Sequence, residues 1–267
     1  MSSVSVADNV APLVLEQRQG GVAFLTLNRP AQYNALSEEM LAALEATFDA
    51  LSTDSSVRVV VLGGAGKAFC AGHDLKQMKA NPNLEYYRRL FGDCSRLMMR
   101  IQSLPQPVIA RVHGIATAAG CQLVAMCDLA VAANDARFAV SGINVGLFCA
   151  TPSVALSRNV GRKAAFEMLV TGEFIDAPTA LERGLINRCV PPERLDQEIR
   201  RLADVIAAKP RSVLAAGKAL FYRQLQGDIG TAYQLAGEAM ACNMIDEVAQ
   251  EGVAAFIEKR SPNWGAE

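Results

Sequence analysis

Short apolar runs alternate with amphipathic helical patterns through the first half of the chain, and this alternation constrains the fold more than any other feature. The clearest run, residues 57–62, is mostly valine and is interrupted only by Arg58, which is typical of a strand covered on both faces. The clearest helical pattern follows Ser37, a good N-cap with acidic residues directly behind it. Strands that alternate with helices predict an α/β fold.

The remaining elements follow from the same patterns. Further strands are predicted at 13–16, 22–27, 108–113 and 128–132. Helices are predicted at 86–103, from about 118, and then almost continuously after Arg162, at 163–171, 178–184, 193–208, 212–226, 229–246 and 248–259. We divide the chain into an α/β core of residues 1–200 and a C-terminal helical region of residues 201–267, whose Met- and Ala-rich faces suit packing on a neighbour.

The composition narrows the class of partner. The 267 residues are 51% hydrophobic and carry a formal net charge of −1, so no general attraction to nucleic acid or to an anionic membrane is expected. No apolar run reaches transmembrane length. Residues 1–17 contain two acids and no basic residue, unlike a signal or transit peptide. A cytoplasmic location is therefore predicted.

Cysteine and histidine usage argues against a metal centre. The seven cysteines are scattered, lie mostly in apolar runs and never have CxxC spacing, and only two histidines are present. We predict reduced thiols in the core, no metal site and no cofactor other than the coenzyme A that a substrate would bring.

Three motifs occur in a fixed order. They are residues 28–36 (NRPAQYNAL), residues 67–76 (KAFCAGHDLK), and residues 107–114 (PVIARVHG) continued by 118–123 (AAGCQL) and 126–128 (MCD). In this order and at these separations they resemble the enoyl-CoA hydratase/isomerase (crotonase) superfamily, from about Leu13 to the tail at 256–260. Residues 114–123 and 144–152 are most similar to the subgroup called enoyl-CoA hydratase domain-containing protein three.

The resemblance implies an architecture and a ligand. The fold would be a crotonase-type (ClpP-like) spiral of ββα units with a C-terminal helical region that mediates trimerisation, giving a homo-trimer or a hexamer. The ligand would be an acyl-CoA thioester.

The resemblance also assigns an oxyanion hole to two turns of small residues. Backbone N–H groups in such turns are natural donors to a developing oxyanion. Transferred residue by residue, the donors are His73 and Ala119, and removal of one such donor typically costs about 3 kcal/mol of transition-state stabilisation. The neighbours Ala71, Asp74 and Gly120 would then border the ligand.

Coenzyme A contacts follow from the same resemblance. The loop of Gln32, Asn34, Ala35 and Leu36 would surround the pantetheine and adenine. Lys76 would lie near the phosphates, and Lys259 would reach them from the C-terminal helix, often that of a neighbouring subunit.

Two positions depart from the family pattern. Hydratases of this family use two glutamates, and the equivalent positions here are Gln122 and Gly142. An amide cannot exchange a proton near neutral pH, although Gln122 can hold a water or a carbonyl by hydrogen bonds. Because general acid–base groups contribute roughly 10²–10⁴ each in rate, efficient hydration by the usual route is not expected.

Other side chains near the motifs are candidates to replace the two absent glutamates. The His73 ring is the only one there that titrates near neutrality, but a purely backbone role is favoured for this residue. Packing is favoured for Cys149 and Ser141, because neither has a visible base, and a structural role for His113. Asn144 would line the acyl pocket as a hydrogen-bonding group.

Three functional hypotheses remain open at this point. The first is a hydratase/isomerase-type (lyase) enzyme with weak or altered hydration. The second is another reaction at the same oxyanion hole, namely isomerisation, decarboxylation or thioester hydrolysis. The third is a non-catalytic acyl-CoA binder.

Overall fold

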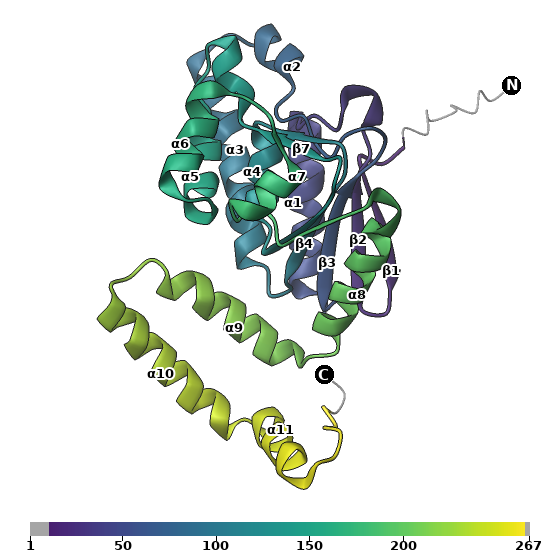
Figure 1. Cartoon of the computed structure of the whole chain (residues 1–267), viewed down its shortest axis with the longest axis vertical. Helices are drawn as coiled ribbons and strands as arrows, with labels where there is room; N and C mark the ends of the chain where they lie inside the picture. Colours follow the sequence, from purple (N-terminus) through teal and green to yellow (C-terminus); the bar gives the residue numbers. More distant parts are fainter. Residues whose placement is uncertain (1–10, 265–267) are drawn as a thin grey trace, which may run out of the picture.

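A computed structural model describes residues 11–264, and its core is a six-stranded sheet (Figure 1). The strand order is β1-β2-β3-β4-β6-β9, with β1 antiparallel to β2 and all later neighbours parallel. The predicted α/β class is confirmed. In chain order the strands are β1 Val14–Gln19, β2 Val22–Leu27, β3 Val59–Gly64, β4 Val108–Val112, β6 Leu129–Ala133 and β9 Arg188–Val190.

A second sheet has three short strands in the order β5-β7-β8. The chain passes directly from β4 into this sheet through a turn at Gly114, which has a φ of +60°. A Cβ on Gly114 would lie 2.1 Å from the carbonyl oxygen of Lys67, so only glycine permits the turn. These strands, which were not predicted, are β5 Ile115–Thr117, β7 Arg137–Ala139 and β8 Ile175–Asp176.

Helices cover both faces of the six-stranded sheet. Along β3, Val60 and Leu62 enter the larger core beneath α1, α3 and α4, whereas Val59 and Val61 pack under α8. The prediction that this strand is buried on both faces is confirmed. The helices are α1 Glu38–Thr53, α3 Leu84–Ser103, α4 Ala119–Met126 and α8 Leu195–Ala207.

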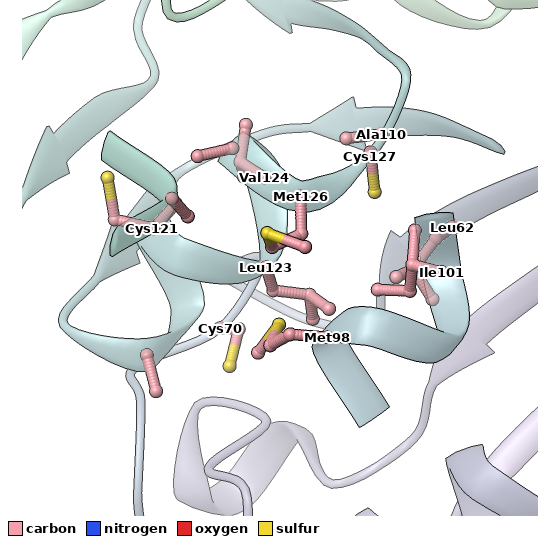
Figure 2. Packing of buried hydrophobic residues seen from close by; sticks show 14 of the residues in the cluster. Leu62, Cys70, Met98, Ile101, Ala110, Cys121, Leu123, Val124, Met126 and Cys127 are labelled. Carbon is pink, nitrogen blue, oxygen red and sulfur yellow. The ribbon is translucent and has the colours of Figure 1, made fainter. Parts of the chain in front are cut away.

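The short helix α4 lies at the centre of the larger core, and all eight of its residues are buried. Figure 2 shows its side chains packed with Met98 and Ile101 of α3. Because α4 is enclosed on all sides, its first turn is held rigidly against the rest of the core.

The remaining helices surround this core. Ser37 accepts a hydrogen bond from the N–H of Met40, which confirms it as the cap of α1. The other elements are the 3₁₀ turns η1 Pro30–Gln32, η2 Ser141–Val145 and η3 Pro192–Arg194, and the helices α2 Leu75–Ala80, α5 Ala150–Asn159, α6 Arg162–Thr171 and α7 Ala177–Glu182.

The last three helices form an arm that leaves the core (Figure 1). The boundary predicted near residue 200 falls inside α8, whose residues Leu195, Ile199 and Ala203 are buried against the sheet. No helix within residues 11–264 is long and apolar enough to span a membrane. The arm consists of α9 Arg211–Gln224, α10 Ile229–Ile245 and α11 Glu247–Glu258.

Candidate active site

A cavity of about 340 Å³ opens beside the N-terminus of α4, within the size range of small-molecule sites. Its walls come from the second motif, from α2 and α3, and from the segment 141–152. The lining is mostly apolar, and none of the described residues that line it is Asp, Glu, Lys or Arg. The apolar walls include Leu75, Met78, Phe91, Leu147 and Phe148.

The two turns with the predicted donors meet at this cavity. Gly72 has a φ of +88°, and a Cβ there would lie 2.9 Å from the Ala118 Cβ and 3.1 Å from the Ala119 nitrogen. The absence of a side chain at Gly72 therefore allows the turn that carries His73 to approach the start of α4. Both predicted donor residues line the cavity.

The direction of each N–H follows from the backbone. Leu36 pairs with His73 as an isolated parallel bridge, in which the Leu36 N–H donates to Gly72 and the Asp74 N–H donates to Leu36. Successive N–H groups of an extended segment point to opposite sides, so the His73 N–H faces away from Leu36. Ala119 is the first residue of α4, where N–H groups have no acceptor within the helix.

Gly120 has a packing role. A Cβ on this residue would lie 2.1 Å from the carbonyl oxygen of Cys70. The missing side chain lets α4 press against the second motif, and this contact also contributes to the spacing of the two turns.

The His73 imidazole projects into the wall of the cavity. Its centroid lies 5.4 Å from that of Phe91 in an edge-on arrangement. Both ring nitrogens are buried, and neither makes a hydrogen bond of normal geometry among the described residues. Burial lowers the pKa of the ring and outweighs the opposing effect of the nearby Leu36 backbone, so the neutral form is favoured at pH 7.

Gln122 lies one turn along α4 from Ala119 and is 5% exposed. Its Oε1 is buried and has no hydrogen-bond partner among the described residues. Gln122 is not one of the residues that line the cavity surface, so it lies behind the wall of the site.

Gly142 lines the cavity but has no room for a side chain. A Cβ would lie 2.5 Å from the Leu147 carbonyl oxygen and 2.8 Å from the Cys149 sulfur. The Gly142 N–H donates to the Cys149 Sγ at 3.3 Å. Burial raises the pKa of the Cys149 thiol, which disfavours the thiolate that nucleophilic attack requires. The neighbouring Ser141 Oγ is 2.8 Å from the Thr117 Oγ1.

Asn34 is a structural residue of the first motif. It is fully buried, its Oδ1 accepts the N–H of Arg29 at 2.9 Å, and its Nδ2 donates to carbonyls of the second motif, including that of Ala68 at 2.8 Å. Ala35 and Leu36 are buried beside it, so these three residues place the loop and offer mainly backbone to a ligand.

Asp74 is occupied by the protein itself. It caps α2 by accepting the N–H groups of Lys76 and Gln77, and it forms an ion pair with Arg29 at 2.8 Å. Desolvation opposes ionisation, but the Arg29 hydrogen bond and the helix N–H groups outweigh it and lower the pKa of Asp74. The first and second motifs are thus joined directly beside His73.

The other predicted contacts are spread more widely. Gln32 and Lys76 are exposed near the first two motifs. Asn144 donates to the carbonyl of Gly172 at 3.2 Å and does not line the cavity. Lys259 follows directly after α11, which lies at the opposite end of the molecule from α2 (Figure 1), so the chain does not bring Lys259 to its own cavity.

His113 has the structural environment that was predicted for it. Its Nε2 lies 2.9 Å from the Gly66 carbonyl oxygen, and its Nδ1 lies 3.2 Å from Arg111. The seven cysteines are free thiols, and no described group of His, Cys, Asp or Glu has the arrangement of a metal site.

A second cavity of about 430 Å³ lies between the outer strands and α8. Its charged residues are largely paired within the protein, since Arg18 binds Asp54 and Arg111 binds Asp196, each at 2.5 Å. It contains none of the predicted site residues.

Sequence reasoning missed the apolar walls of the cavity. Leu75, Met78 and Phe91 lie on α2 and α3, where their apolar character was indistinguishable from that of core-facing positions. These residues can be recognised as lining the cavity only once the fold has placed α3 beside the second motif.

Comparison with known proteins decides the family, because residues 17–267 match the family model described as enoyl-CoA hydratase/isomerase. The chain belongs to this family. A Rattus norvegicus protein named enoyl-CoA hydratase domain-containing protein 3, mitochondrial, is 47% identical over 252 residues, or 94% of this chain and 84% of the rat protein.

Solved structures agree with this assignment. A crystal structure of an enoyl-CoA hydratase from Mycobacterium smegmatis has a TM-score of 0.94 and 66% identity, covering 95% of this chain and 99% of that chain. The crystal structure of human enoyl-CoA hydratase domain-containing protein 3 has a TM-score of 0.92 and 44% identity, covering 94% of this chain and 100% of that chain. The predicted family, its subgroup resemblance and the crotonase fold of ββα units with C-terminal helices are confirmed.

Proposed function

We propose that the chain binds an acyl-CoA thioester in the cavity beside α4 and polarises its carbonyl with the backbone N–H groups of His73 and Ala119. The supporting observation is the close approach at Gly72, which brings the two turns together at one cavity. Both donors belong to rigid backbone, so they need no reorganisation as negative charge develops on the thioester oxygen. Family membership supports the choice of an acyl-CoA ligand.

Coenzyme A would lie along the first motif and α2. The buried loop at Ala35 and Leu36 offers backbone groups, and exposed Lys76 offers a positive charge for phosphate. Lys259 would contribute only from another subunit, because it lies at the far end of its own chain.

The reaction would be of hydratase/isomerase (lyase) type with weak or altered hydration. The supporting observation is that no described carboxylate lines the cavity. By the resemblance of the sequence motifs, Gln122 and Gly142 would stand where hydratases of the family have glutamates. Polarisation of the carbonyl acidifies the acyl Cα and stabilises an enolate or a tetrahedral intermediate. Isomerisation, decarboxylation and thioester hydrolysis all pass through such species, and a non-catalytic binder would use the same contacts.

Crotonyl-CoA tests these alternatives. Loss of the conjugated-alkene absorbance, together with mass analysis of the products, would be followed in the presence of the protein. We expect a second-order rate constant well below about 10⁴ M⁻¹ s⁻¹, the lower end of the usual enzyme range. A value inside that range would contradict altered hydration. Free thiol release would indicate a thioesterase, and thermal stabilisation without turnover would indicate a binder.

The arm supports a second proposal, that the chain forms a homo-trimer or a hexamer. Large apolar side chains on α10 and α11 are mostly exposed in the single chain, and the exposed fraction reaches 75% at Tyr233 and Ile245 and 85% at Phe256. Contiguous apolar surface of this kind marks an interface. Sedimentation velocity would measure the assembly.

We also propose a cytoplasmic location. The scattered cysteines support it, and so does the net charge of −1, from which no general attraction to membranes is expected. The Rattus norvegicus relative carries the word mitochondrial in its name. Imaging of a fluorescent fusion in the source cells would test the location.

A further inference from the structure

One face of the six-stranded sheet is only partly covered by α8. The helix packs over β3 and β4 through a cluster that includes Ile199, Val61 and Ile109. Phe24 of β2 is the partner of Val61, and Gln17 of β1 is the partner of Phe24, so both side chains lie on this same face. A cavity of about 430 Å³, here called the α8 cavity, lies over these outer strands beside α8. Because α4 packs on the opposite face of the sheet, the α8 cavity is separate from the cavity beside α4.

Gly63 of β3 provides the floor of the α8 cavity. It pairs with Thr26 of β2 and shares the face of Val61, two residues earlier. A Cβ on Gly63 would lie 3.5 Å from the Cδ of Arg111, so the Arg111 side chain lies against the glycine. The missing side chain leaves a hollow, and the volume of the cavity lies within the range of small-molecule sites.

Arg200 of α8 brings an unpaired positive charge to this cavity. Its guanidinium carbon lies 4.4 Å from the centroid of the Phe24 ring, a cation–π contact that holds the side chain over β2. Asp196, one turn earlier on α8, pairs instead with Arg111 of β4 at 2.5 Å. Arg18, which also lines the cavity, is bound to two carboxylates. Within residues 11–264, Arg200 has no carboxylate partner and no acceptor for its N–H groups.

The other free polar groups of the cavity are neutral. Gln17, Gln19 and Thr26 line it, and their side chains have no hydrogen-bond partner in the described part of the chain. Amide and hydroxyl groups both donate and accept, which matches the hydroxyl groups of a ligand. The side chain of Asp196, which also lines the cavity, is 79% exposed and repels a second negative charge. The lining therefore suits a ligand with one negative charge and several hydroxyl groups.

We propose that the α8 cavity binds a hydroxylated monocarboxylate, whose carboxylate pairs with Arg200 and whose hydroxyl groups meet the neutral side chains of β1 and β2. The planar guanidinium can donate two parallel hydrogen bonds to a carboxylate. A phosphate monoester would bring a second negative charge, which Asp196 disfavours. The proposal does not depend on the acyl-CoA site.

Isothermal titration of the full chain with three probes tests the chemical class of the ligand. Gluconate has one carboxylate and several hydroxyl groups, glucose has the hydroxyl groups without the charge, and glucose 6-phosphate has a phosphate in place of the carboxylate. We expect gluconate to bind about tenfold more tightly than glucose, the effect of one charge-assisted contact, and more tightly than glucose 6-phosphate. Failure of gluconate to bind at millimolar concentration, or tighter binding of either other probe, would overturn the proposal.

Two neighbouring arginines of α8 provide a matched pair of variants. Arg200→Gln keeps hydrogen-bond donors but removes the charge, and should weaken gluconate binding about tenfold. Arg201→Gln removes the same charge from a side chain that pairs with Glu198 and does not line the cavity, and should leave the affinity unchanged. An equal effect of the two substitutions, or no effect of Arg200→Gln, would contradict the assignment of Arg200.

Gly63→Ala tests the cavity itself without changing any charge. The added methyl group meets its nearest neighbour at an ordinary contact distance, so the variant should fold, and thermal melts would establish this. It occupies the floor of the cavity and should also weaken gluconate binding. Unchanged gluconate binding in a folded Gly63→Ala variant would show that the ligand lies elsewhere.

Discussion

At the scale of single residues, the spacing of the two proposed backbone donors, His73 and Ala119, depends on Gly72. Its φ of +88° strains any other residue, and a Cβ would press on Ala118 and on the Ala119 nitrogen. Gly72→Ala should therefore lower the free energy of unfolding by about 1–3 kcal/mol and widen the gap between the donors. We expect butyryl-CoA affinity to fall about tenfold, measured by isothermal titration.

The β1–β2 turn offers a matched control for backbone strain. Gly20 also has a positive φ, of +60°, but a Cβ there would meet nothing within 4 Å. Gly20→Ala should lower stability through the same kind of strain and leave the affinity for butyryl-CoA unchanged. An equal loss of affinity in both variants would show that Gly72 does not set the donor spacing.

Gly142 shows why a carboxylate is not easily introduced at this position of the cavity wall. Its Cβ direction is closed by the Leu147 carbonyl and the Cys149 sulfur. Gly142→Glu should destabilise the fold by about 1–3 kcal/mol through overpacking and should not raise the rate of crotonyl-CoA hydration. Gly161→Glu, at a site with open space, is the control for stability. Increased hydration by Gly142→Glu would mean that the segment yields and that the position can serve catalysis.

His73 should make stability depend on pH in the acidic range. Because burial lowers the pKa of its imidazole, the unfolded chain binds a proton at higher pH than the folded chain. This ring leaves stability unchanged above the ordinary histidine pKa of about 6.5 and reduces it as pH falls below that value, by at most about 1.4 kcal/mol per pH unit. Urea unfolding at pH 7.5 and 5.5 should show a smaller loss for His73→Phe than for the wild type. An identical loss in both proteins would contradict this role.

At the scale of elements, one buried cation attaches the C-terminal arm to the core. Lys218 of α9 donates to the carbonyls of Ile101 and Gln106, each at 2.9 Å, and to the Asp128 carboxylate at 2.6 Å. Tyr222, one turn later, donates to the other oxygen of Asp128 at 2.7 Å. The cluster joins α9 to the end of α3 and to the residues just before β4 and β6, in a site where each charge has a partner.

Lys218→Met should therefore be strongly destabilising, because it leaves the Asp128 charge largely buried without its cation. We expect a loss of about 3–5 kcal/mol in the free energy of unfolding, measured by chemical denaturation. Lys163→Met, on the exposed side of α6, should change stability by less than about 0.5 kcal/mol. A small effect of Lys218→Met would show that apolar packing, rather than the ion pair, attaches α9.

The sequence predicted most closely the elements with long periodic patterns. The β3 strand and the helices α1, α3 and α8 to α11 have enough apolar residues at regular spacing to show their type and nearly their ends. The strands β5, β7 and β8 have only two or three residues each, too few for a period. They exist because tertiary contacts, such as the close approach at Gly114, impose extended backbone.

The same contrast between local patterns and tertiary contacts applies to the candidate site. The motifs located the two turns, because small residues at these positions allow a ligand to approach the backbone closely. The unsatisfied His73 ring and the closed space at Gly142 could not be predicted, since both depend on neighbours distant in sequence, such as Phe91 and Leu147.

At the scale of the whole molecule, the arm places a basic group far from the cavity of its own chain. Apolar α10 and α11 extend from the core, and Lys259 follows directly after α11 (Figure 1). An assembly that covers the exposed apolar faces would carry this end of the chain onto a neighbour. Assembly and coenzyme A binding would then be linked by mass action.

Phe256→Asp tests this link, because Phe256 is 85% exposed in the single chain and an aspartate would carry a charge into a buried interface. We expect sedimentation velocity to show a shift from trimer or hexamer towards monomer. In the assembled protein, Lys259→Ala should weaken CoA binding about threefold to tenfold, the range for loss of one charge-assisted contact. In the Phe256→Asp background the same substitution should have no further effect, because no neighbour receives the lysine. If Lys259→Ala weakened binding equally in both backgrounds, Lys259 would act within its own chain, and the link between assembly and the site would be wrong.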